Sequence, residues 1–210
     1  MPGANPERST AADLLASDVP ELQRYRLRRT EDEVTSYVGM VIFLGSWAMM
    51  FAALFFAYAV VRIRAPMWPP PDQPALPILV PGLNTAVIAA SSAVVALAVR
   101  AHALGRPRRA SIGLALGAAL GALFLALQAV VWVGLWRAGL VPSGGPYPSV
   151  FYALTAFHAL HVLVGLAALG MLAIGRPSRG ATRSAVRLWG MFWHFVGVVW
   201  VALYVAVYLL

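Results

Sequence analysis

Five long apolar runs constrain this chain more than any other feature of its sequence. A helix needs about 20 residues to cross a hydrocarbon core of about 30 Å. Every run is long enough, and none carries Asp, Glu or Arg at its centre. The sequence therefore predicts an all-α integral membrane protein whose five transmembrane helices form a bundle. The runs cover residues 37–61, 79–99, 110–136, 149–174 and 185–210.

The composition agrees with a membrane protein and excludes several other classes. Hydrophobic residues make up 60% of the chain and charged residues 11%, against about 45–50% and about 25% in soluble domains. The net charge of +8 comes from 16 basic residues, all Arg, which lie in short clusters between the runs. A nucleic-acid-binding protein would present a basic face on a soluble domain, so we expect no nucleic-acid partner. The absence of cysteine excludes disulfides, iron–sulfur clusters and covalent c-type haem.

The charged residues also divide the chain and predict its orientation. Seven of the eight acids lie before the first run, so residues 1–33 are predicted to be a polar, flexible cytoplasmic tail and residues 34–210 the membrane domain. Thirteen Arg fall in the tail and in the connections on the same side as it, and three fall on the other side. Because Lys and Arg concentrate on the cytoplasmic side, we expect a cytoplasmic N-terminus and an external C-terminus.

Three glycines in the third run are spaced four residues apart. Gly113, Gly117 and Gly121 share one helix face and would let another backbone approach closely. This pattern favours packing within the bundle, and contact with a partner subunit is the alternative.

Few polar residues lie inside the predicted spans, and these are the candidate functional residues. His158 and His161 are one helical turn apart, and His194 could approach them from the fifth span. Three imidazoles could ligate haem or a metal, relay protons, bind lipid phosphate with help from basic residues, or form structural hydrogen bonds between helices. The candidates for lipid-contacting or structural roles are Asn84, Gln128, His158, His161, Trp193, His194, Arg183 and Arg187.

Two segments of the chain resemble signatures of subunit III of haem–copper terminal oxidases. They are FYALTAFHALHVLVG at residues 151–165 and FWHFVGVVW at residues 192–200, with weaker echoes in FAALFFAY at 51–58, PGLNT at 81–85 and Gln128. The resemblance runs in order from about residue 37 to residue 210. It is closest to the short five-helix bacterial form, with a cytoplasmic N-terminus.

The resemblance implies an accessory membrane subunit of a cytochrome c or quinol oxidase in the bacterial cytoplasmic membrane. Such a subunit is not catalytic alone. It lies beside catalytic subunit I, with subunit II as a further partner, and it stabilises the catalytic subunit and supports its proton uptake. Haem and copper belong to the partner subunits, so we expect no cofactor or metal on this chain, although structural phospholipid is expected. An accessory subunit of nitric oxide reductase and a stand-alone transporter or b-type cytochrome are the alternatives.

The sequence departs from the resembled family at four positions that usually carry acids. These positions are occupied by apolar residues or glycine, so we expect any role of those carboxylates, including proton capture, to be missing here. The four residues are Trp47, Val131, Gly144 and Gly197.

Overall fold

The computed structural model describes residues 11–71, 73–175 and 182–210, with side chains from residue 31 onward except those of residues 32, 182 and 183. In this part of the chain the regular elements are all helical. The elements are α1 (Ala11–Arg64), α2 (Leu79–Ala103), α3 (Pro107–Arg137), the 3₁₀ turn η1 (Pro142–Gly144), α4 (Pro146–Ile174), α5 (Thr182–Leu203) and the π-helical turn η2 (Tyr204–Leu209).

The predicted all-helical membrane architecture is confirmed. Five helices are long and apolar enough to cross a membrane, and they match the five predicted runs with slightly different ends. Prolines begin α3 and α4, at a helical position where the missing N–H costs no hydrogen bond. The five spans are Glu33–Arg64, Leu79–Ala103, Pro107–Arg137, Pro146–Ile174 and Ser184–Leu209.

The chain divides into two units inside α1. The described part of residues 1–42 is the first portion of that helix, and residues 43–210 contain the rest of α1 together with α2–α5. The division at residues 33 and 34, which the charge distribution predicts, stays a prediction about where the polar tail ends.

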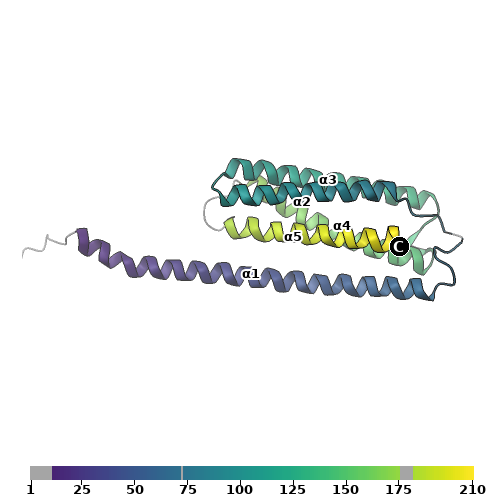
Figure 1. The fold of residues 1–210 in the computed structure, drawn as a ribbon, viewed down its shortest axis with the longest axis horizontal. Coiled ribbons are helices and arrows are strands. Elements are labelled where there is room, and N and C mark those ends of the chain that lie inside the picture. The colour runs from purple at the N-terminus through teal and green to yellow at the C-terminus, as the bar shows by residue number, and fades with distance from the viewer. Residues whose placement is uncertain (1–10, 72, 176–181) are drawn as a thin grey trace, which may run out of the picture. The chain divides into compact units, whose positions relative to one another are not determined.

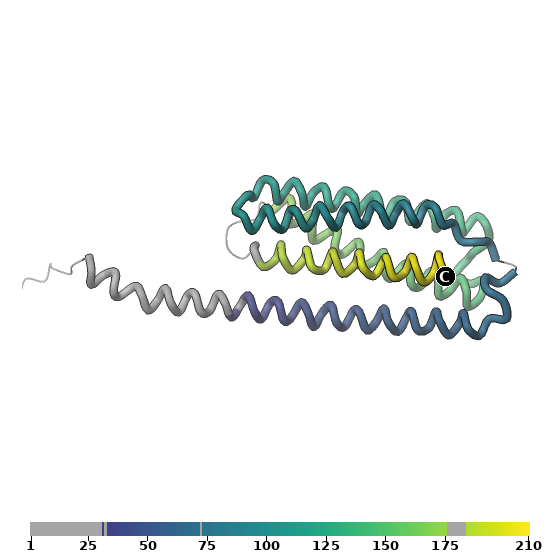
Figure 2. Tube along the Cα trace, in the orientation of Figure 1, coloured from purple at the N-terminus to yellow at the C-terminus, as the bar shows by residue number. Residues whose placement is uncertain are grey.

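Within residues 43–210, α2 and α3 run side by side in opposite directions (Figures 1 and 2). Their close approach depends on the glycine face of α3. A Cβ added at Gly113 would lie 2.8 Å from Cβ of Ala98, and one added at Gly117 would lie 2.5 Å from Cγ2 of Val95. Real Cβ atoms do not come this close, so only glycine fits at these two positions.

A tryptophan from α5 fills a socket of glycines on the neighbouring helices. An added Cβ at Gly121 of α3 would lie 2.5 Å from Cη2 of Trp193, and one at Gly165 of α4 would lie 2.8 Å from Cε3 of the same ring. Trp193 is fully buried. The third glycine of the sequence pattern therefore faces α5, while the first two face α2.

The first span is far less buried than the last. Only 6% of its most apolar window is buried, against 50% for the window of Ser184–Leu209. The part of α1 after residue 42 meets the other helices through large rings: Phe51 and Tyr58 are buried. Trp68, in the connection to α2, packs edge-on against both Tyr58 and Tyr147 of α4, so this connection folds back onto the helix ends.

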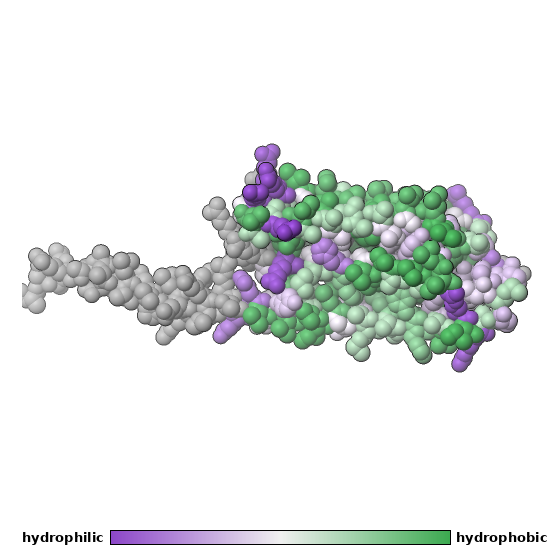
Figure 3. Space-filling model, in the orientation of Figure 1, coloured by the Kyte–Doolittle hydropathy of each residue, from purple (hydrophilic) through white to green (hydrophobic). Residues whose placement is uncertain are grey.

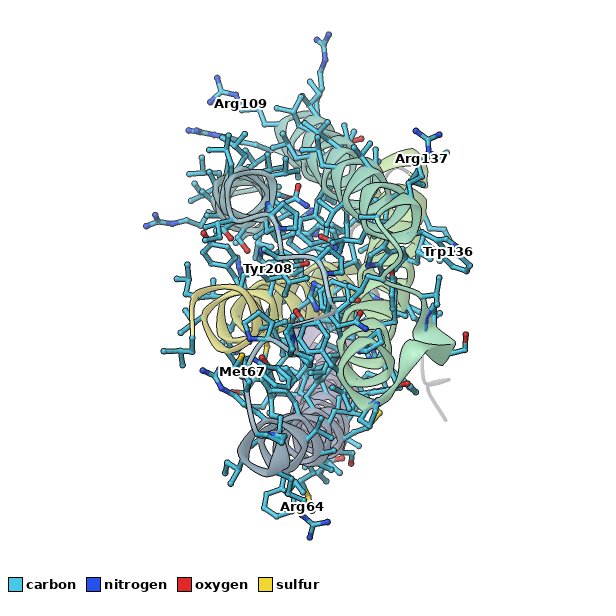
Figure 4. All side chains as sticks on the ribbon, turned by 90° about the vertical axis from the view of Figure 1, so that its right-hand side faces the viewer. Arg64, Met67, Arg109, Trp136, Arg137 and Tyr208 are labelled. Atoms are coloured by element: carbon cyan, nitrogen blue, oxygen red, sulfur yellow. The ribbon has the colours of Figure 1, made fainter. Side chains whose placement is uncertain are left out.

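The surface has the polarity expected of a protein embedded in lipid. Figure 3 shows hydrophobic residues across the middle of the visible face and hydrophilic residues gathered at its ends. In the end-on view of Figure 4, Arg64, Arg109 and Arg137 extend away from the helices, whereas Tyr208 lies among them and is buried.

Replacing Gly117 with leucine should destabilise the bundle. The new side chain would collide with Val95, and overpacking of this kind costs about 1–3 kcal/mol. Gly134→Leu is the matched control on the same helix, because nothing lies within 4 Å of its Cβ position. Thermal unfolding in mild detergent would measure the difference, and equal melting temperatures for the two variants would contradict the packing described here.

Candidate functional site: the polar residues inside the spans

Three hydrogen bonds join α5 to α2 along their length. Nε1 of Trp193 donates to Oγ of Ser91 at 3.0 Å, and Nε1 of Trp200 donates to Oγ1 of Thr85 at 3.0 Å. Nδ1 of His194 lies 3.2 Å from Oγ of Ser92. Between the two tryptophan pairs the residue numbers rise on α5, from 193 to 200, and fall on α2, from 91 to 85, as antiparallel packing requires. We call these three pairs the α2–α5 ladder.

Two of the ladder hydroxyls also bind backbone carbonyls. Ser91 donates to the carbonyl of Gly117 in α3 at 2.9 Å, and Thr85 donates to the carbonyl of Pro81 in its own helix at 2.9 Å. A hydroxyl has one hydrogen to donate and can accept as well. Ser91 therefore uses both capacities and connects α5, α2 and α3 at one point.

His158 lies inside the bundle among aromatic rings. It is 1% exposed and its ring centroid is 5.4 Å from that of Trp200, 5.8 Å from Phe124 and 6.4 Å from Phe51. Among the described residues, neither ring nitrogen has a hydrogen-bond partner. The α5 residue beside His158 is thus Trp200, not His194.

His161 is held within its own helix and against α1. Its Nδ1 lies 2.6 Å from the carbonyl of Phe157, one turn earlier. Its ring meets Trp47 edge-on, with 4.0 Å between the centroids, and Phe51 at 5.1 Å. Its other nitrogen, Nε2, has no hydrogen-bond partner in the described part of the chain.

His158, His161 and His194 therefore have different polar surroundings, although His158 and His161 both meet the ring of Phe51. His194 pairs with Ser92, His161 with its own backbone, and His158 with aromatic rings. Across the described ranges, no group of three or more His, Cys, Asp or Glu side chains could hold a metal ion. The three histidines that the sequence suggested could converge therefore do not form such a group.

The two amide side chains of the spans bind across the bundle. Nδ2 of Asn84 donates to the carbonyl of Phe124 at 3.4 Å, and Nε2 of Gln128 donates to the hydroxyl of Tyr208 at 3.4 Å. Asn84 and Gln128 are both buried. Asn84 therefore links α2 to α3, and Gln128 links α3 to η2.

Sequence reasoning did not select the hydroxyl partners of the tryptophans as site residues. Besides Thr85 and Ser91, Thr155 of α4 accepts a hydrogen bond from Nε1 of Trp132 at 3.2 Å. Trp193 and Trp200 are seven residues apart, or two helical turns, and Ser91 and Thr85 are six apart. These similar spacings are compatible with pairing between antiparallel helices, but they do not identify the partners.

Of the four positions that depart from the resembled family, Val131 and Gly197 are buried, Trp47 is half-buried and Gly144 is exposed. Trp47 contacts His161, and Val131 is buried. Gly144 lies in η1, with its Cβ position in ordinary contact with Pro148. A Cβ at Gly197 would lie 3.2 Å from Oγ of Ser92 in the ladder.

The two arginines among the candidates belong to the start of α5. Arg187 is exposed. The side chain of Arg183 lies outside the described residues.

Comparison with known proteins gives a consistent result. The sequence model of the family described as Cytochrome c oxidase subunit III matches residues 30–210. A protein of Synechocystis sp. named cytochrome c oxidase subunit 3 is 36% identical over 176 residues, which cover 82% of this chain and 74% of that protein. A protein of Nocardia farcinica named probable cytochrome c oxidase subunit 3 is 36% identical over 81% of this chain and 86% of its own length.

The likeness extends to vertebrates. The protein of Danio rerio named cytochrome c oxidase subunit 3 is 34% identical over 179 residues, 81% of this chain and 67% of that protein. Helical architecture, the extent of the family match and these relatives lead to one conclusion: this chain belongs to the cytochrome c oxidase subunit III family.

Proposed function

We propose that this chain is an accessory, non-catalytic subunit of a haem–copper oxygen reductase of the cytochrome c oxidase type, in the aerobic respiratory chain. The observation that carries the proposal is the family match over residues 30–210. Its direct partner is the catalytic subunit that holds haem and copper, called subunit I, and subunit II is a further partner. The chain contributes stability to that assembly.

The geometry of the polar residues supports a structural role. Trp132, Trp193 and Trp200 each donate to a side-chain hydroxyl of another helix. Because hydrocarbon offers no hydrogen-bond partner, polar groups in a span bind to one another. Asn84 and Gln128 bind in the same way. These residues hold helices together, and we assign them no step in the reduction of oxygen.

We infer that support of proton uptake by this subunit is indirect. The family's usual acidic positions hold Trp47, Val131, Gly144 and Gly197 here, and none of these side chains can bind a proton at neutral pH. The subunit therefore acts by keeping the catalytic subunit in its working arrangement, and proton capture falls to other chains.

We further propose a multi-pass location in the bacterial cytoplasmic membrane with the N-terminus in the cytoplasm. The Arg clusters support this orientation: Arg100, Arg106, Arg108 and Arg109 surround the α2–α3 connection, and cytoplasmic connections are rich in Arg. Phospholipid contact is assigned to the start of α5, where Arg187 is exposed and Arg183 precedes it. His158 and His161 are buried and are assigned to packing.

Purification of the tagged chain in mild detergent should recover a haem–copper subunit that consumes oxygen. The visible spectrum and identification of the bound proteins by mass spectrometry provide the measurement. An untagged strain is the control. Recovery of a nitric oxide reductase, or of no haem protein at all, would contradict the proposal.

Removing one pair of the α2–α5 ladder should lower stability without lowering turnover. Trp200→Phe deletes the donor of the bond to Thr85, and such bonds contribute about 0.6 kcal/mol on average inside membranes. Trp200→Phe, Thr85→Ala and the double variant form a cycle that measures the coupling by detergent unfolding. Trp136→Phe is the control, because Trp136 is 59% exposed. Loss of oxygen consumption per assembled haem in the ladder variants would argue against a structural role.

His158→Leu should leave both haem content and turnover unchanged. Both nitrogens of the buried ring lack partners among the described residues, and replacing an unsatisfied polar group by an apolar one of similar size is nearly neutral or stabilising. The measurement is haem absorbance and oxygen consumption of the purified complex. A fall of about a hundredfold in turnover with assembly intact would show that His158 takes part in the chemistry.

A further inference from the structure

A groove opens between α2 and α5 beside the ladder. It has a volume of about 480 Å³, and its lining in the described part of the chain comes from these two helices. Its walls are small or apolar, and its polar groups are the ladder pair Ser92 and His194. The lining residues that matter below are Ala89, Ser92, His194, Gly197, Val198 and Ala202.

The groove lies near the middle of the membrane. His194 lies within about 4 Å of the midpoint of the last span, Ser184–Leu209, at a rise of about 1.5 Å per residue. Ser92 comes thirteen residues after Leu79 and eleven before Ala103, the ends of the second span. Half of a hydrocarbon core is about 15 Å, which puts both residues beyond the reach of lipid headgroups.

The groove presents a polar ring at this depth. His194 is partly exposed, and among the described residues Ser92 is its hydrogen-bond partner, through Nδ1. The ring keeps a second nitrogen, Nε2, that can donate or accept according to the tautomer. A polar group facing acyl chains is costly, and in membrane proteins such groups face the protein interior or a partner.

Small residues give the groove the form of a helix-binding surface. A Cβ added at Gly197 would lie only 3.2 Å from Oγ of Ser92. Glycine at this position therefore lets α5 pack closely against Ser92. Ala89 and Ala202 are exposed, and their small side chains take up little of the groove. Membrane helices associate where small residues allow close approach and a polar side chain bonds across the contact. The groove has both features.

We propose that this groove seats a membrane-spanning helix of another oxidase subunit, which presents a hydrogen-bonding side chain to His194. Lipid does not fit the site, since acyl chains have no hydrogen-bonding group and headgroups do not reach this depth. A partner helix satisfies the imidazole and fills the space between the small residues. This inference rests on the proposed function, because it takes the partner from the same oxidase complex.

A photo-reactive side chain in the groove tests what occupies it. A small diazirine-bearing amino acid is placed in place of Ala89, which lines the groove, or in place of the adjacent Ala90, which is also exposed but not part of the lining. The complex is then purified and irradiated. We expect the probe at position 89 to couple to a peptide of another oxidase subunit and the probe at position 90 to yield mainly lipid adducts.

Three results would overturn the groove assignment while leaving the proposed function intact. They are lipid adducts alone at position 89, coupling to a second copy of this chain, and equal protein coupling at both positions, each in a preparation that retains its haem–copper subunit. If no haem–copper subunit is present in the preparation, the proposed function fails and this inference fails with it. Haem absorbance before irradiation separates the two cases.

Substitutions supply a second, independent measurement. Ala89→Leu should reduce the haem–copper subunit retained after a detergent wash about five- to thirtyfold, the effect of losing a contact of about 1–2 kcal/mol. Ala90→Leu should change it less than about twofold. His194→Phe should also reduce retention, and more than Ser92→Ala, which removes only the internal bond to Nδ1. Equal retention in Ala89→Leu and Ala90→Leu, or in His194→Phe and Ser92→Ala, would contradict the proposal.

Discussion

Hydrocarbon cannot accept a hydrogen bond, and this constraint organises the interior of residues 43–210. An indole N–H buried in a span must find an acceptor on another part of the protein. Trp132, Trp193 and Trp200 each find a hydroxyl on a neighbouring helix. Two of these bonds join α2 and α5, and they set the register of these two helices. A one-turn slip would leave two indoles unsatisfied at once, so the register is specified by polar groups and not by apolar contact alone.

The close packing of α2, α3, α4 and α5 depends on one of these tryptophans, Trp193. Trp193 can reach Ser91 only because Gly121 and Gly165 leave room for its ring. Ser91 in turn donates to the carbonyl of Gly117, one of the glycines through which α3 packs against α2. The glycines, the indole and the hydroxyl are therefore parts of one arrangement. A larger residue at any of the glycines would disturb a hydrogen bond as well as a contact.

The sequence was sufficient to predict the helices but not the pairing of their polar residues. Hydropathy identifies the spans because each apolar run must cover the same thickness of hydrocarbon, and the five runs match the five helices. The glycine spacing pointed to a close contact, yet it could not say that Gly121 meets α5 while Gly113 meets α2. The bond between Trp193 and Ser91 joins residues 102 positions apart, and nothing local encodes it.

The histidines show where local reasoning fails. The spacing of His158 and His161 predicts a shared helix face, and both are buried. Which side chains face them depends on helix rotation. The ring beside His158 is that of Trp200, seven residues after Trp193, while His194 points to Ser92. A rotation of α5 that no periodicity specifies decides whether an imidazole meets another imidazole or an indole.

The sparse burial of the first span has a consequence for biogenesis. The ring contacts that α1 makes with α4 and α5 after residue 42 involve residues that are synthesised much later, since Phe43 meets Phe192 and Trp47 meets His161. While the ribosome is still producing α2 and α3, this helix must remain in the bilayer as a solitary segment. Its mean hydropathy of 2.1 is high enough for it to stay in the bilayer without those contacts. The span with the smallest buried share is thus one that precedes its packing partners in α4 and α5 along the chain.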